Sequence, residues 1–517
     1  MVKHNKKVKA EMMYNNYIYI PLCENNSYEV RALKLIKLLE NTKIIRYSGN
    51  LDAEIEGIAY DSRKVSKNFL FICIRGSFSD GHDFIDKAVE NGAVAVIVDK
   101  AVERADVAVI QVENSRAAMP IIGANFYEHP TDELKLIGVT GTNGKTTTTY
   151  FIRSIMQHAE KEAGLIGTIS VDVGSKKVES SRTTPESVDL QRIFRDMLSN
   201  GAEYGIMEVS SHSLEFGRVD QCRFQIGIFT NLTQDHLDFH GNFANYRRAK
   251  EKLFYKTTKA NIINIDDEHG RIICSRIKEQ DTPLLTFGID REANIMAKDI
   301  EINDEGIRFT LMTPEYEAII RSSIPGKFSV YNSLAAASVA YVEGIGKEFI
   351  CRGIEAAGFV PGRSEVLPLD KPYKIIIDYA HAPDGLENIL KSIRHYAKGR
   401  IITVFGCGGD RDKTKRPIMG EIAGRLSDYA IITSDNPRSE DPNMIIDQIE
   451  EGMKTTNCDY ICIENRKDAI RHAMMMAEAS DIILLAGKGH EAYQVLKDKV
   501  IDFDEREIVK ELLKEGI

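Results

Sequence analysis

The sequence predicts an α/β protein of three domains, in which parallel sheets are covered by helices. Two observations carry this prediction. Short apolar runs alternate with helical patterns along the chain, which is typical of βαβ units. The chain also has 517 residues, which at roughly 150 residues per domain predicts three or four domains. A stretch containing Gly and Pro at 358–363 is expected to link the last two blocks.

The expected elements follow in order. A loose extension rich in Lys, Asn and Tyr covers residues 1–27, and the first block then has strands at 69–74 and 93–98 with a helix near 84–91. A helical pattern at 115–127, stopped by His129-Pro130, leads into the second block. The strands expected in the second block lie at 134–139, 203–209, 226–229 and 260–265, and its closing helix at 330–342. Those of the third block lie at 373–377, 401–405, 429–433 and 482–486.

Composition excludes several classes of protein. Lys and Arg total 67 and Asp and Glu total 77, so the net charge is −10, which disfavours nucleic-acid binding. No apolar run approaches the ~20 residues of a membrane span, and the short apolar patch at 17–23 is broken by Pro21, which argues against a signal peptide. The eight cysteines are scattered without a CxxC pair, which favours a reducing compartment. We therefore expect a cytoplasmic protein without membrane insertion.

The strongest local signal is a glycine-rich loop at 138–147, which reads Gly-Val-Thr-Gly-Thr-Asn-Gly-Lys-Thr-Thr. It follows an apolar strand and precedes a helical pattern, so its backbone N–H groups and the helix N-terminus can hold phosphate. Lys145 can neutralise the β- and γ-phosphates, and the Thr146 hydroxyl can reach Mg²⁺. Val139 stands where the strict pattern has Gly, so this is a variant loop, and a chance glycine-rich turn is the alternative.

Candidate metal ligands follow two later strands. Glu208 ends one strand and precedes Ser210-Ser211-His212, whereas Asp235, His236 and His240 follow the next. In open α/β sheets ligands gather beyond the carboxyl ends of strands, so both groups can face the phosphate loop. A hard cation prefers carboxylate oxygen and water. A solvated turn is the alternative for 235–240, and zinc is disfavoured because neither HExxH nor a cysteine partner is present.

Together with later motifs, these residues resemble the Mur ligases, ATP-dependent amide ligases that build the peptidoglycan stem peptide. The resemblance runs from about residue 28 to the C-terminus, and the ordered set of motifs makes it specific. Its motifs are Asp61-Ser-Arg63, Gly141–Thr146, Thr183-Thr-Pro185, Met207–Leu214, Asn231–Asp238, Tyr246–Lys250, Asn264–Asp267, Tyr331–Ser333, Gly362-Arg363, Asp378–His381, Gly406–Lys413, Asp435–Arg438 and Gly487–Glu491. Within the family, the motifs are most similar to those of members that extend UDP-N-acetylmuramoyl-L-alanyl-D-glutamate.

The resemblance implies a UDP-substrate-binding domain at 28–114, a central P-loop ATPase at 115–359 and a Rossmann-like amino-acid-binding domain at 360–517. It also implies ATP and two Mg²⁺ ions. The expected ATP-binding residues are Gly141, Thr142, Asn143, Gly144, Lys145, Thr146, Thr147, Asn264, Asp266 and Asn332. The expected metal-binding residues are Thr146, Glu208, His236 and Lys250, and the expected catalytic residues are Lys145, Glu208, His236, Lys250 and His212.

Three further implications of the resemblance concern individual side chains. Ser62, Thr183, Thr184, Ser210 and Arg218 would hold the muramoyl peptide, although 61–63 can also be read as a polar turn. Lys250 would be carbamylated and support the second metal, whereas by spacing alone it is an ordinary helix-surface lysine. His212 and His381 are candidate catalytic helpers or simply hydrogen-bonded turn residues.

The motif Asp435-Asn-Pro-Arg438, which follows a strand of the third block, indicates which amino acid the ligase adds. A guanidinium group can hold a carboxylate with two hydrogen bonds, and meso-diaminopimelate differs from lysine by a distal carboxylate. By resemblance the pocket comprises Arg411, Asp435, Asn436, Arg438, Gly487 and Glu491. Alternatives are a lysine-adding member, another Mur or folylpolyglutamate-type ligase, or a catalytically silent nucleotide-binding scaffold. We expect a monomer whose partners are its small-molecule substrates.

Overall fold

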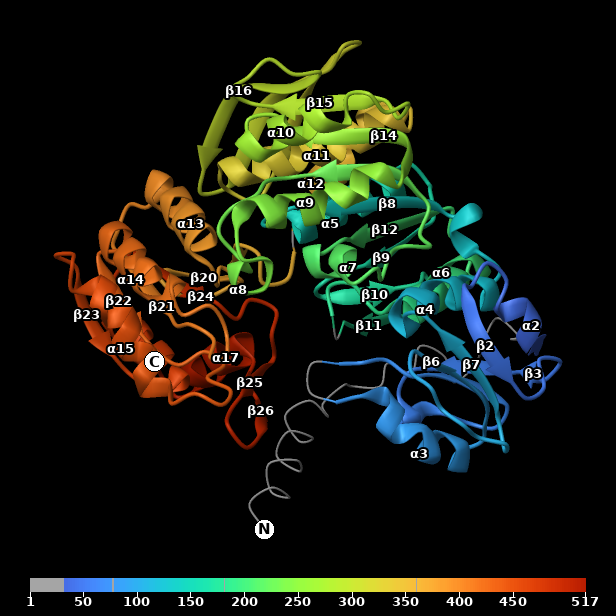
Figure 1. Cartoon of the computed structure of the whole chain (residues 1–517). Coiled ribbons are helices and arrows are strands. Elements are labelled where there is room, and N and C mark those ends of the chain that lie inside the picture. The colour runs from blue at the N-terminus through green and yellow to red at the C-terminus, as the bar shows by residue number, and fades with distance from the viewer. Residues whose placement is uncertain (1–31, 77–78, 181, 359) are drawn as a thin grey trace.

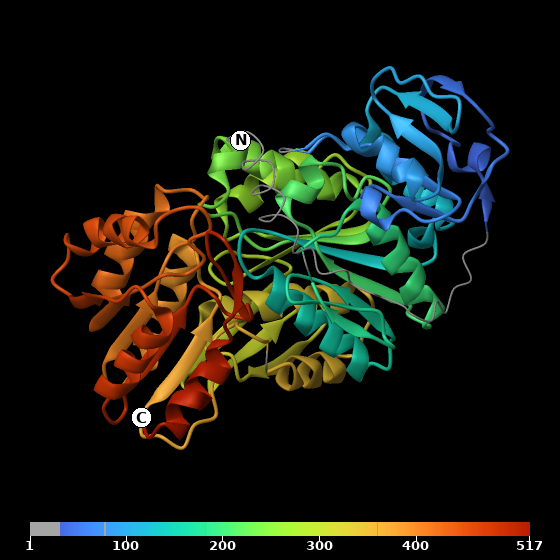
Figure 2. The ribbon, with the colours of Figure 1, turned by 90° about the horizontal axis from the view of Figure 1, so that it is seen from below.

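The computed structural model describes residues 32–76, 79–180, 182–358 and 360–517. The extension expected at 1–27 lies outside them. Three main sheets follow one another along the chain, each with its own helices, and Figure 1 shows the second sheet between the other two. Figure 2 gives the same arrangement from below. The predicted α/β class with three domains is therefore confirmed.

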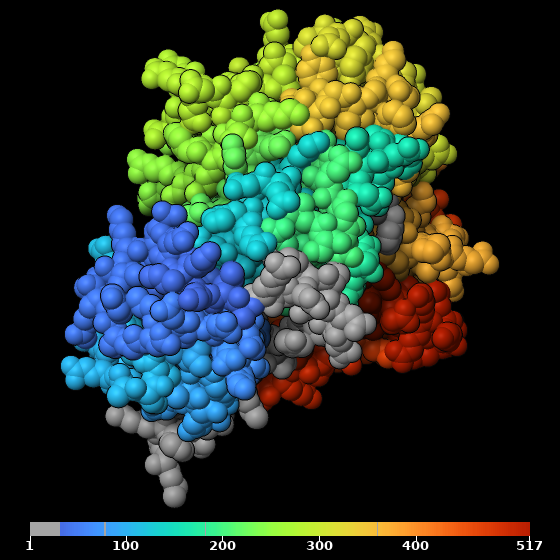
Figure 3. All heavy atoms as spheres, turned by 90° about the vertical axis from the view of Figure 1, so that its right-hand side faces the viewer, coloured from blue at the N-terminus to red at the C-terminus, as the bar shows by residue number. Residues whose placement is uncertain are grey.

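The N-terminal domain contains a five-stranded sheet in the order β2-β7-β6-β5-β4. Strands β4 to β7 are parallel, and β2 adds an antiparallel edge. The bounds are β2 Ile44–Ser48, β4 Gly57–Ala59, β5 Phe69–Ile72, β6 Ala93–Val98 and β7 Ala108–Val112, with helices α2 Leu35–Leu38, α3 Ile85–Glu90 and α4 Ser115–Phe126. A two-stranded sheet of β1 Leu33–Lys34 and β3 Glu54–Ile55 completes the domain. Figure 3 shows this domain, in blue, against the central domain.

Helix α4 lies between the first two domains. The Asn114 side chain caps the helix by accepting from the Ala117 amide at 3.1 Å. Met119 and Ile122 lie in the core of the N-terminal domain together with Val188, from helix α6 (Ser187–Ser199) of the central domain. Because this helix packs against both domains, the boundary between residues 114 and 115 stays a prediction, as do the other domain boundaries.

The central domain contains an eleven-stranded sheet in the order β11-β10-β9-β12-β8-β13-β14-β15-β16-β17-β18. In this spatial order, the seven neighbouring strands β9, β12, β8, β13, β14, β15 and β16 are parallel. The strands at both edges are antiparallel. The strands are β8 Lys135–Thr140, β9 Ala163–Ile166, β10 Ser170–Asp172, β11 Lys177–Glu179, β12 Tyr204–Glu208, β13 Phe224–Phe229, β14 Thr257–Asn264, β15 Leu284–Gly288, β16 Ile295–Asn303, β17 Gly306–Met312 and β18 Glu317–Ser322. The helices are α5 Lys145–His158, α6 Ser187–Ser199, α7 Ser211–Glu215, α8 Leu237–His240, α9 Phe243–Glu251, α10 Glu268–Ile277, α11 Lys327–Val342 and α12 Lys347–Ala356.

Both faces are buried in the middle of this sheet, at β9, β12, β8 and β13, which explains the nearly continuous apolar runs of these strands. Side chains alternate between the faces along β8. Ile137 packs in the core that holds Phe151 of α5, whereas Leu136 packs in the core that holds Phe194 of α6. The loops at the carboxyl ends of these strands are thereby fixed on a rigid base.

The C-terminal domain has a six-stranded sheet in the order β19-β20-β24-β21-β22-β23, parallel except for the β19 edge. The strands are β19 Glu365–Val366, β20 Lys374–Asp378, β21 Ile401–Phe405, β22 Tyr429–Ile432, β23 Asp459–Cys462 and β24 Ile482–Ala486, followed by a hairpin of β25 Tyr493–Val495 and β26 Val500–Asp502. The helices are α13 Pro383–Tyr396, α14 Lys415–Leu426, α15 Pro442–Met453, α16 Arg466–Met476 and α17 Glu505–Lys514. No helix in the described part of the chain is long and apolar enough to span a membrane.

Candidate active site

The phosphate loop (residues 138–147) connects β8 to α5, as predicted. Gly144 has φ +83°, and a Cβ there would lie 2.4 Å from Asn332 Oδ1. A Cβ on Gly141 would lie 1.9 Å from Thr230 Oγ1, so neighbouring side chains leave no room at either position. Helix α5 begins at Lys145, and its first turn lines a cavity of about 540 Å³. A helix N-terminus that opens into a cavity is suited to an anion.

Lys145 folds back over this loop. Its Nζ donates to the carbonyl oxygens of Gly141 and Thr142 at 2.9 and 2.8 Å. Burial lowers the pKa of its ammonium group. The charge is therefore stabilised in this structure by carbonyl dipoles at the mouth of the phosphate loop.

Glu208, at the end of β12, is a buried carboxylate held by hydrogen bonds. It accepts from Thr146 Oγ1 at 3.0 Å, from the Thr168 amide at 2.8 Å and from Thr168 Oγ1 at 2.9 Å. Thr168 was not predicted; its position shortly after β9, at the carboxyl edge of the sheet, was the only signal in the sequence. A carboxylate beside a hydroxyl supplies the hard oxygen ligands that Mg²⁺ prefers.

The remaining predicted metal ligands lie on the segment after β13. His236 has φ +54° and packs edge-on against His212, with ring centroids 4.8 Å apart. Burial lowers the pKa of both imidazoles, so both are neutral near pH 7. The ring centroid of His212 also lies 4.3 Å from that of Phe239. This packing is compatible with either predicted reading of His212, as a catalytic residue or as a structural one. Among the described residues, no group of three or more His, Cys, Asp or Glu side chains could by itself hold a metal.

Lys250 is not on the surface, so the plain reading of it as a helix-surface lysine is wrong. Its side chain is 1% exposed, and its Nζ donates to the Gly141 carbonyl at 2.6 Å. Burial and the nearby Lys145 ammonium lower its pKa well below the ordinary value. The spacing along α9 did not reveal this, because the burial comes from the phosphate loop packed above it.

The other side of the cavity is formed by β14, β15 and α11. The Asn332 side chain lies over the first turn of α5, where its Oδ1 accepts from Thr148 Oγ1 at 3.4 Å. Asp266 accepts from the amides of residues 289–291 and from the Tyr331 hydroxyl at 2.9 Å. Asn264 positions Asp266 by accepting from its amide at 3.0 Å. Asp266 therefore holds the loop beside the cavity in place. The sequence predicted that Asp266 lies near the nucleotide, but it did not predict this structural role.

Four of the five predicted muramoyl-peptide residues converge at the end of β12. Thr184 Oγ1 donates to the Glu208 carbonyl at 2.9 Å, and Arg218 Nη1 donates to the Thr184 carbonyl at 3.1 Å. Ser210 caps α7 and lies 3.3 Å from Thr184 Oγ1, while Thr183 lines the cavity. Ser62 lies apart from them in the N-terminal domain, in the short 3₁₀ turn Ser62–Lys64.

The predicted amino-acid pocket (Arg411, Asp435, Asn436, Arg438, Gly487 and Glu491) lies at the carboxyl ends of β21, β22 and β24. Asn436 Nδ2 donates to Glu491 Oε2 at 2.8 Å. Lys488, fully buried, donates to the same carboxylate oxygen at 3.3 Å. A Cβ on Gly487 would lie 2.6 Å from Asp435 Oδ2, so this glycine admits the carboxylate.

Arg438 presents a second, positive side of this pocket. It has φ +52°, a backbone conformation uncommon for an arginine. Its Nη1 donates to the Gly409 carbonyl at 2.8 Å. Burial and the neighbouring Arg411 lower the pKa of its guanidinium group, because like charges are brought together. Two cations held by carbonyl groups rather than by carboxylates are suited to an incoming carboxylate.

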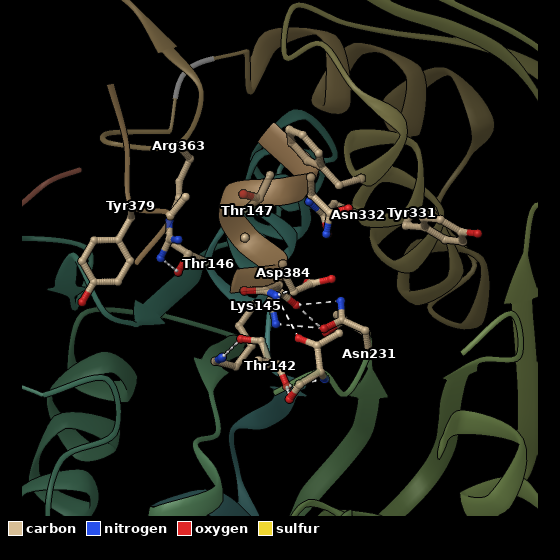
Figure 4. Close-up of a pocket in the computed structure, with 18 of the residues that line it drawn as sticks. Thr142, Lys145, Thr146, Thr147, Asn231, Tyr331, Asn332, Arg363, Tyr379 and Asp384 are labelled. Carbon is tan, nitrogen blue, oxygen red and sulfur yellow. Dashed lines mark hydrogen bonds between the residues drawn. The ribbon is translucent and has the colours of Figure 1, made fainter. Parts of the chain in front are cut away.

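The C-terminal domain completes the cavity above the phosphate loop. Asp384, near the start of α13, accepts from Asn143 Nδ2 at 2.7 Å, and Arg363 Nη2 donates to Thr146 Oγ1 at 3.1 Å. Figure 4 shows Arg363 and Tyr379 on one side of the loop and Tyr331 and Asn332 on the other. Tyr379 also lies 3.5 Å from Glu491 Oε1, so the cavity and the amino-acid pocket are adjacent. Asp384 and Tyr379 were not assigned in advance, although both follow β20 at a strand's carboxyl end.

His381 also lines the cavity, where its Nδ1 lies 2.8 Å from the Tyr379 carbonyl. Burial and the Lys415 ammonium lower the pKa of this imidazole. The geometry therefore places a neutral, hydrogen-bonded histidine at the cavity wall, a position compatible with either of its predicted readings.

Sequence-family profiles match all three domains. The Mur ligase catalytic domain matches residues 54–127, the Mur ligase middle domain 139–340 and the Mur ligase glutamate ligase domain 362–489.

Curated relatives match over nearly the whole chain. The UDP-N-acetylmuramoyl-L-alanyl-D-glutamate–2,6-diaminopimelate ligase 1 of Clostridium acetobutylicum is 50% identical and covers 93% of this chain and 100% of its own length. The ligase of the same name, without the numeral, from Alkaliphilus oremlandii is 50% identical over 93% of this chain and 99% of its own length. A solved structure of a UDP-N-acetylmuramoyl-L-alanyl-D-glutamate–2,6-diaminopimelate ligase is 29% identical, with a TM-score of 0.65, and covers 94% of this chain and 99% of its own. The chain belongs to the Mur ligase family.

Proposed function

We propose that this chain is an ATP-dependent ligase that adds meso-diaminopimelate to UDP-N-acetylmuramoyl-L-alanyl-D-glutamate, releasing ADP and phosphate. The observation that carries the proposal is the junction of two sites at one cavity. The phosphate loop forms its floor, and Tyr379 joins it to a pocket that contains both arginines and carboxylates. Near-complete matches to curated diaminopimelate ligases support the same substrates.

The chemistry follows from the weakness of a free carboxylate as an electrophile. An oxygen of the D-glutamate carboxylate attacks the γ-phosphorus of ATP, the bond to the β-phosphate bridging oxygen breaks, and ADP leaves. The amine of the incoming amino acid then attacks the acyl phosphate, and the tetrahedral intermediate expels phosphate as the amine loses its proton. Because the first step joins two anions, cationic groups and positioning are the main source of catalysis.

The residues around the phosphate loop suit this task. Lys145 can move from the carbonyl groups it now contacts to the γ-phosphate, where it offsets developing charge. The loop amides and the first turn of α5 hold the remaining phosphate oxygens. Arg363 and Asp384 bring the C-terminal domain against this loop, so they position the attacking amine and exclude water.

The donor set fits Mg²⁺. Glu208 and Thr146 would hold one ion, with phosphate oxygens and water as its other ligands. His236 would join them, and Lys250 would hold a second ion if its buried amine carries a carbamate, as in the family it resembles. Bound Mg²⁺ supplies charge neutralisation between the phosphates and the carboxylate.

Arg438 and Arg411 favour meso-diaminopimelate over L-lysine, because only the former offers them a distal carboxylate. Glu491 would pair with the distal ammonium. A lysine-adding ligase would leave the half-buried Arg438 guanidinium and the neighbouring Arg411 without an anion.

The direct experiment measures phosphate release from ATP with UDP-N-acetylmuramoyl-L-alanyl-D-glutamate and a panel of amino acids. We expect strong stimulation by meso-diaminopimelate and little by L-lysine. Preference for lysine would contradict the pocket assignment, and stimulation only by another nucleotide peptide would indicate a different Mur ligase. No release with any substrate would indicate a silent scaffold. We further propose that the protein is a cytoplasmic monomer. Light scattering after size-exclusion chromatography measures its oligomeric state.

A further inference from the structure

Three arginines from separate segments converge on one buried carboxylate outside the phosphate loop. Arg116 of α4 lies 3.3 Å from Glu186 Oε2. Arg182 and Arg218 lie 2.6 and 3.0 Å from Glu186 Oε1. The Glu186 side chain is only 7% exposed, so the four groups form a compact cluster with two more positive charges than negative.

The cluster is electrostatically costly to the protein. The Phe216 ring lies 5.4 Å from the Arg116 guanidinium carbon and 5.8 Å from that of Arg218, which brings the two cations to one ring. Burial, together with Arg182 and Arg116, lowers the pKa of Arg218. Within the described residues, Arg218 Nε is buried without a hydrogen-bond partner. Uncompensated buried donors and like charges are expected at sites that await an anion.

The position of the cluster narrows the choice of anion. Arg218 Nη1 bonds to the Thr184 carbonyl, and Thr184 bonds to the strand end that carries Glu208, so the cluster adjoins the cavity. On the other side the Tyr60 hydroxyl, in the N-terminal domain, donates to Asp189 of α6. Tyr60 directly precedes the predicted substrate motif at 61–63. The arginines therefore lie on the route between the N-terminal domain and the phosphate loop.

We propose that Arg116 and Arg182 join Arg218 in a subsite for an oxyanion of the UDP-linked substrate, and that Glu186 is the positioning residue that gathers them. This rests on the proposed function, in which the substrate spans the N-terminal domain and the phosphate loop. Such a substrate carries a diphosphate and free carboxylates, and both kinds of oxyanion accept paired hydrogen bonds from guanidinium groups.

The test is direct binding of two ligands, UDP-N-acetylmuramic acid with and without its L-alanyl-D-glutamyl dipeptide, measured by calorimetry. Arg116→Met and Arg182→Met are each expected to weaken binding of the dipeptide-bearing ligand about 10- to 100-fold, the range for hydrogen bonds to charged groups. Arg223→Met is the matched control, because Arg223 is 64% exposed and its nearest carboxylate, on Asp132, is 3.8 Å away. Affinity for an ATP analogue should stay unchanged in all three variants.

The outcomes separate the possibilities. Equal weakening for both ligands identifies the diphosphate, whereas weakening confined to the dipeptide-bearing ligand identifies a peptide carboxylate. In either case the salt dependence of binding should be smaller in the variants than in the parent chain. If both variants fold and bind both ligands as the parent does, the subsite is wrong while the proposed function stands. If the parent chain binds neither ligand, the proposed function itself fails.

Discussion

The phosphate loop and the amino-acid pocket manage charge in different ways. At the loop, the Nζ atoms of Lys145 and Lys250 both bond to the Gly141 carbonyl. In the pocket, Lys488 lies 3.3 Å from Glu491, and its charge helps to hold the pKa of Asp435 below the usual value despite burial. Carbonyl dipoles stabilise the two lysines at the first site, whereas Lys488 and the carboxylates stabilise one another at the second.

This difference assigns different tasks to the two sites. A cation held only by carbonyl groups can move to a phosphate without breaking an ion pair, so the loop is prepared for charge that develops during reaction. In the pocket, Lys488 is already paired with Glu491 before ligand arrives, whereas Arg438 and Arg411 are held by carbonyl groups. A pocket that combines a preformed ion pair with cations open to a carboxylate is suited to discriminate between amino acids. Substitutions at the loop should therefore act on turnover, and those at the pocket on amino-acid affinity.

The largest expected effect is at the loop. Lys145→Met should lower kcat for phosphate release by about 1,000-fold, because the cation that we propose to move to the γ-phosphate is lost. Steady-state ADP release measures it. Lys161→Met is the control, since Lys161 is 42% exposed and pairs with Glu203 away from the cavity. A kcat within tenfold of the parent value would contradict the role given to Lys145.

Next in size is the effect of Glu208→Gln, which removes the buried carboxylate but keeps its shape. We expect about a 100-fold lower kcat and a higher Mg²⁺ concentration at half-maximal activity. Chelation by EDTA should abolish activity in the parent chain, and added Mg²⁺ should restore it. Glu203→Gln, at an exposed carboxylate near the opposite end of β12, should change neither quantity. An unchanged Mg²⁺ titration for the Glu208 variant would argue that the metal is held elsewhere.

Many strands of the parallel sheets were predictable because they are buried on both faces and form continuous apolar runs, although the parallel strands β7 and β9 were not predicted. The predicted strands 93–98, 401–405 and 482–486 coincide with β6, β21 and β24. The antiparallel edge β16–β18 was not predicted, since its burial alternates and its apolar pattern is weak. Side chains that gain their place from another domain were also missed. Asp384 is one, because its contact with Asn143 joins residues 241 positions apart.

The amino-acid pocket should respond in affinity rather than in turnover. Arg438→Ala is expected to raise the KM for meso-diaminopimelate about 10- to 100-fold, since a hydrogen bond between charged groups is lost, and to leave the KM for ATP unchanged. Initial-rate kinetics with each substrate varied in turn measures this. Arg425→Ala removes an arginine that is 52% exposed and pairs with Glu421, and serves as the control. Equal increases in both KM values would count against direct contact with the amino acid.

The smallest expected effect is a pH dependence of the pocket. Burial raises the pKa of Glu491, and the nearby Asp435 carboxylate raises it further, while Lys488 opposes both. Glu491 is therefore protonated at a higher pH than a free glutamate, and the protonated form cannot pair with an ammonium group. As the pH falls through this raised pKa, the KM for meso-diaminopimelate should rise by up to about tenfold per pH unit, as for a single proton.

Above that pKa the KM should be constant. Glu491→Gln should give a high KM with little dependence on pH, because the titrating group is gone. The KM for ATP, measured over the same range, provides the internal control for effects on the phosphate loop. If the KM of Glu491→Gln depended on pH as steeply as that of the parent chain, another group would carry the titrating proton. The ion pair between Lys488 and Glu491 would then not control the binding of the amino acid.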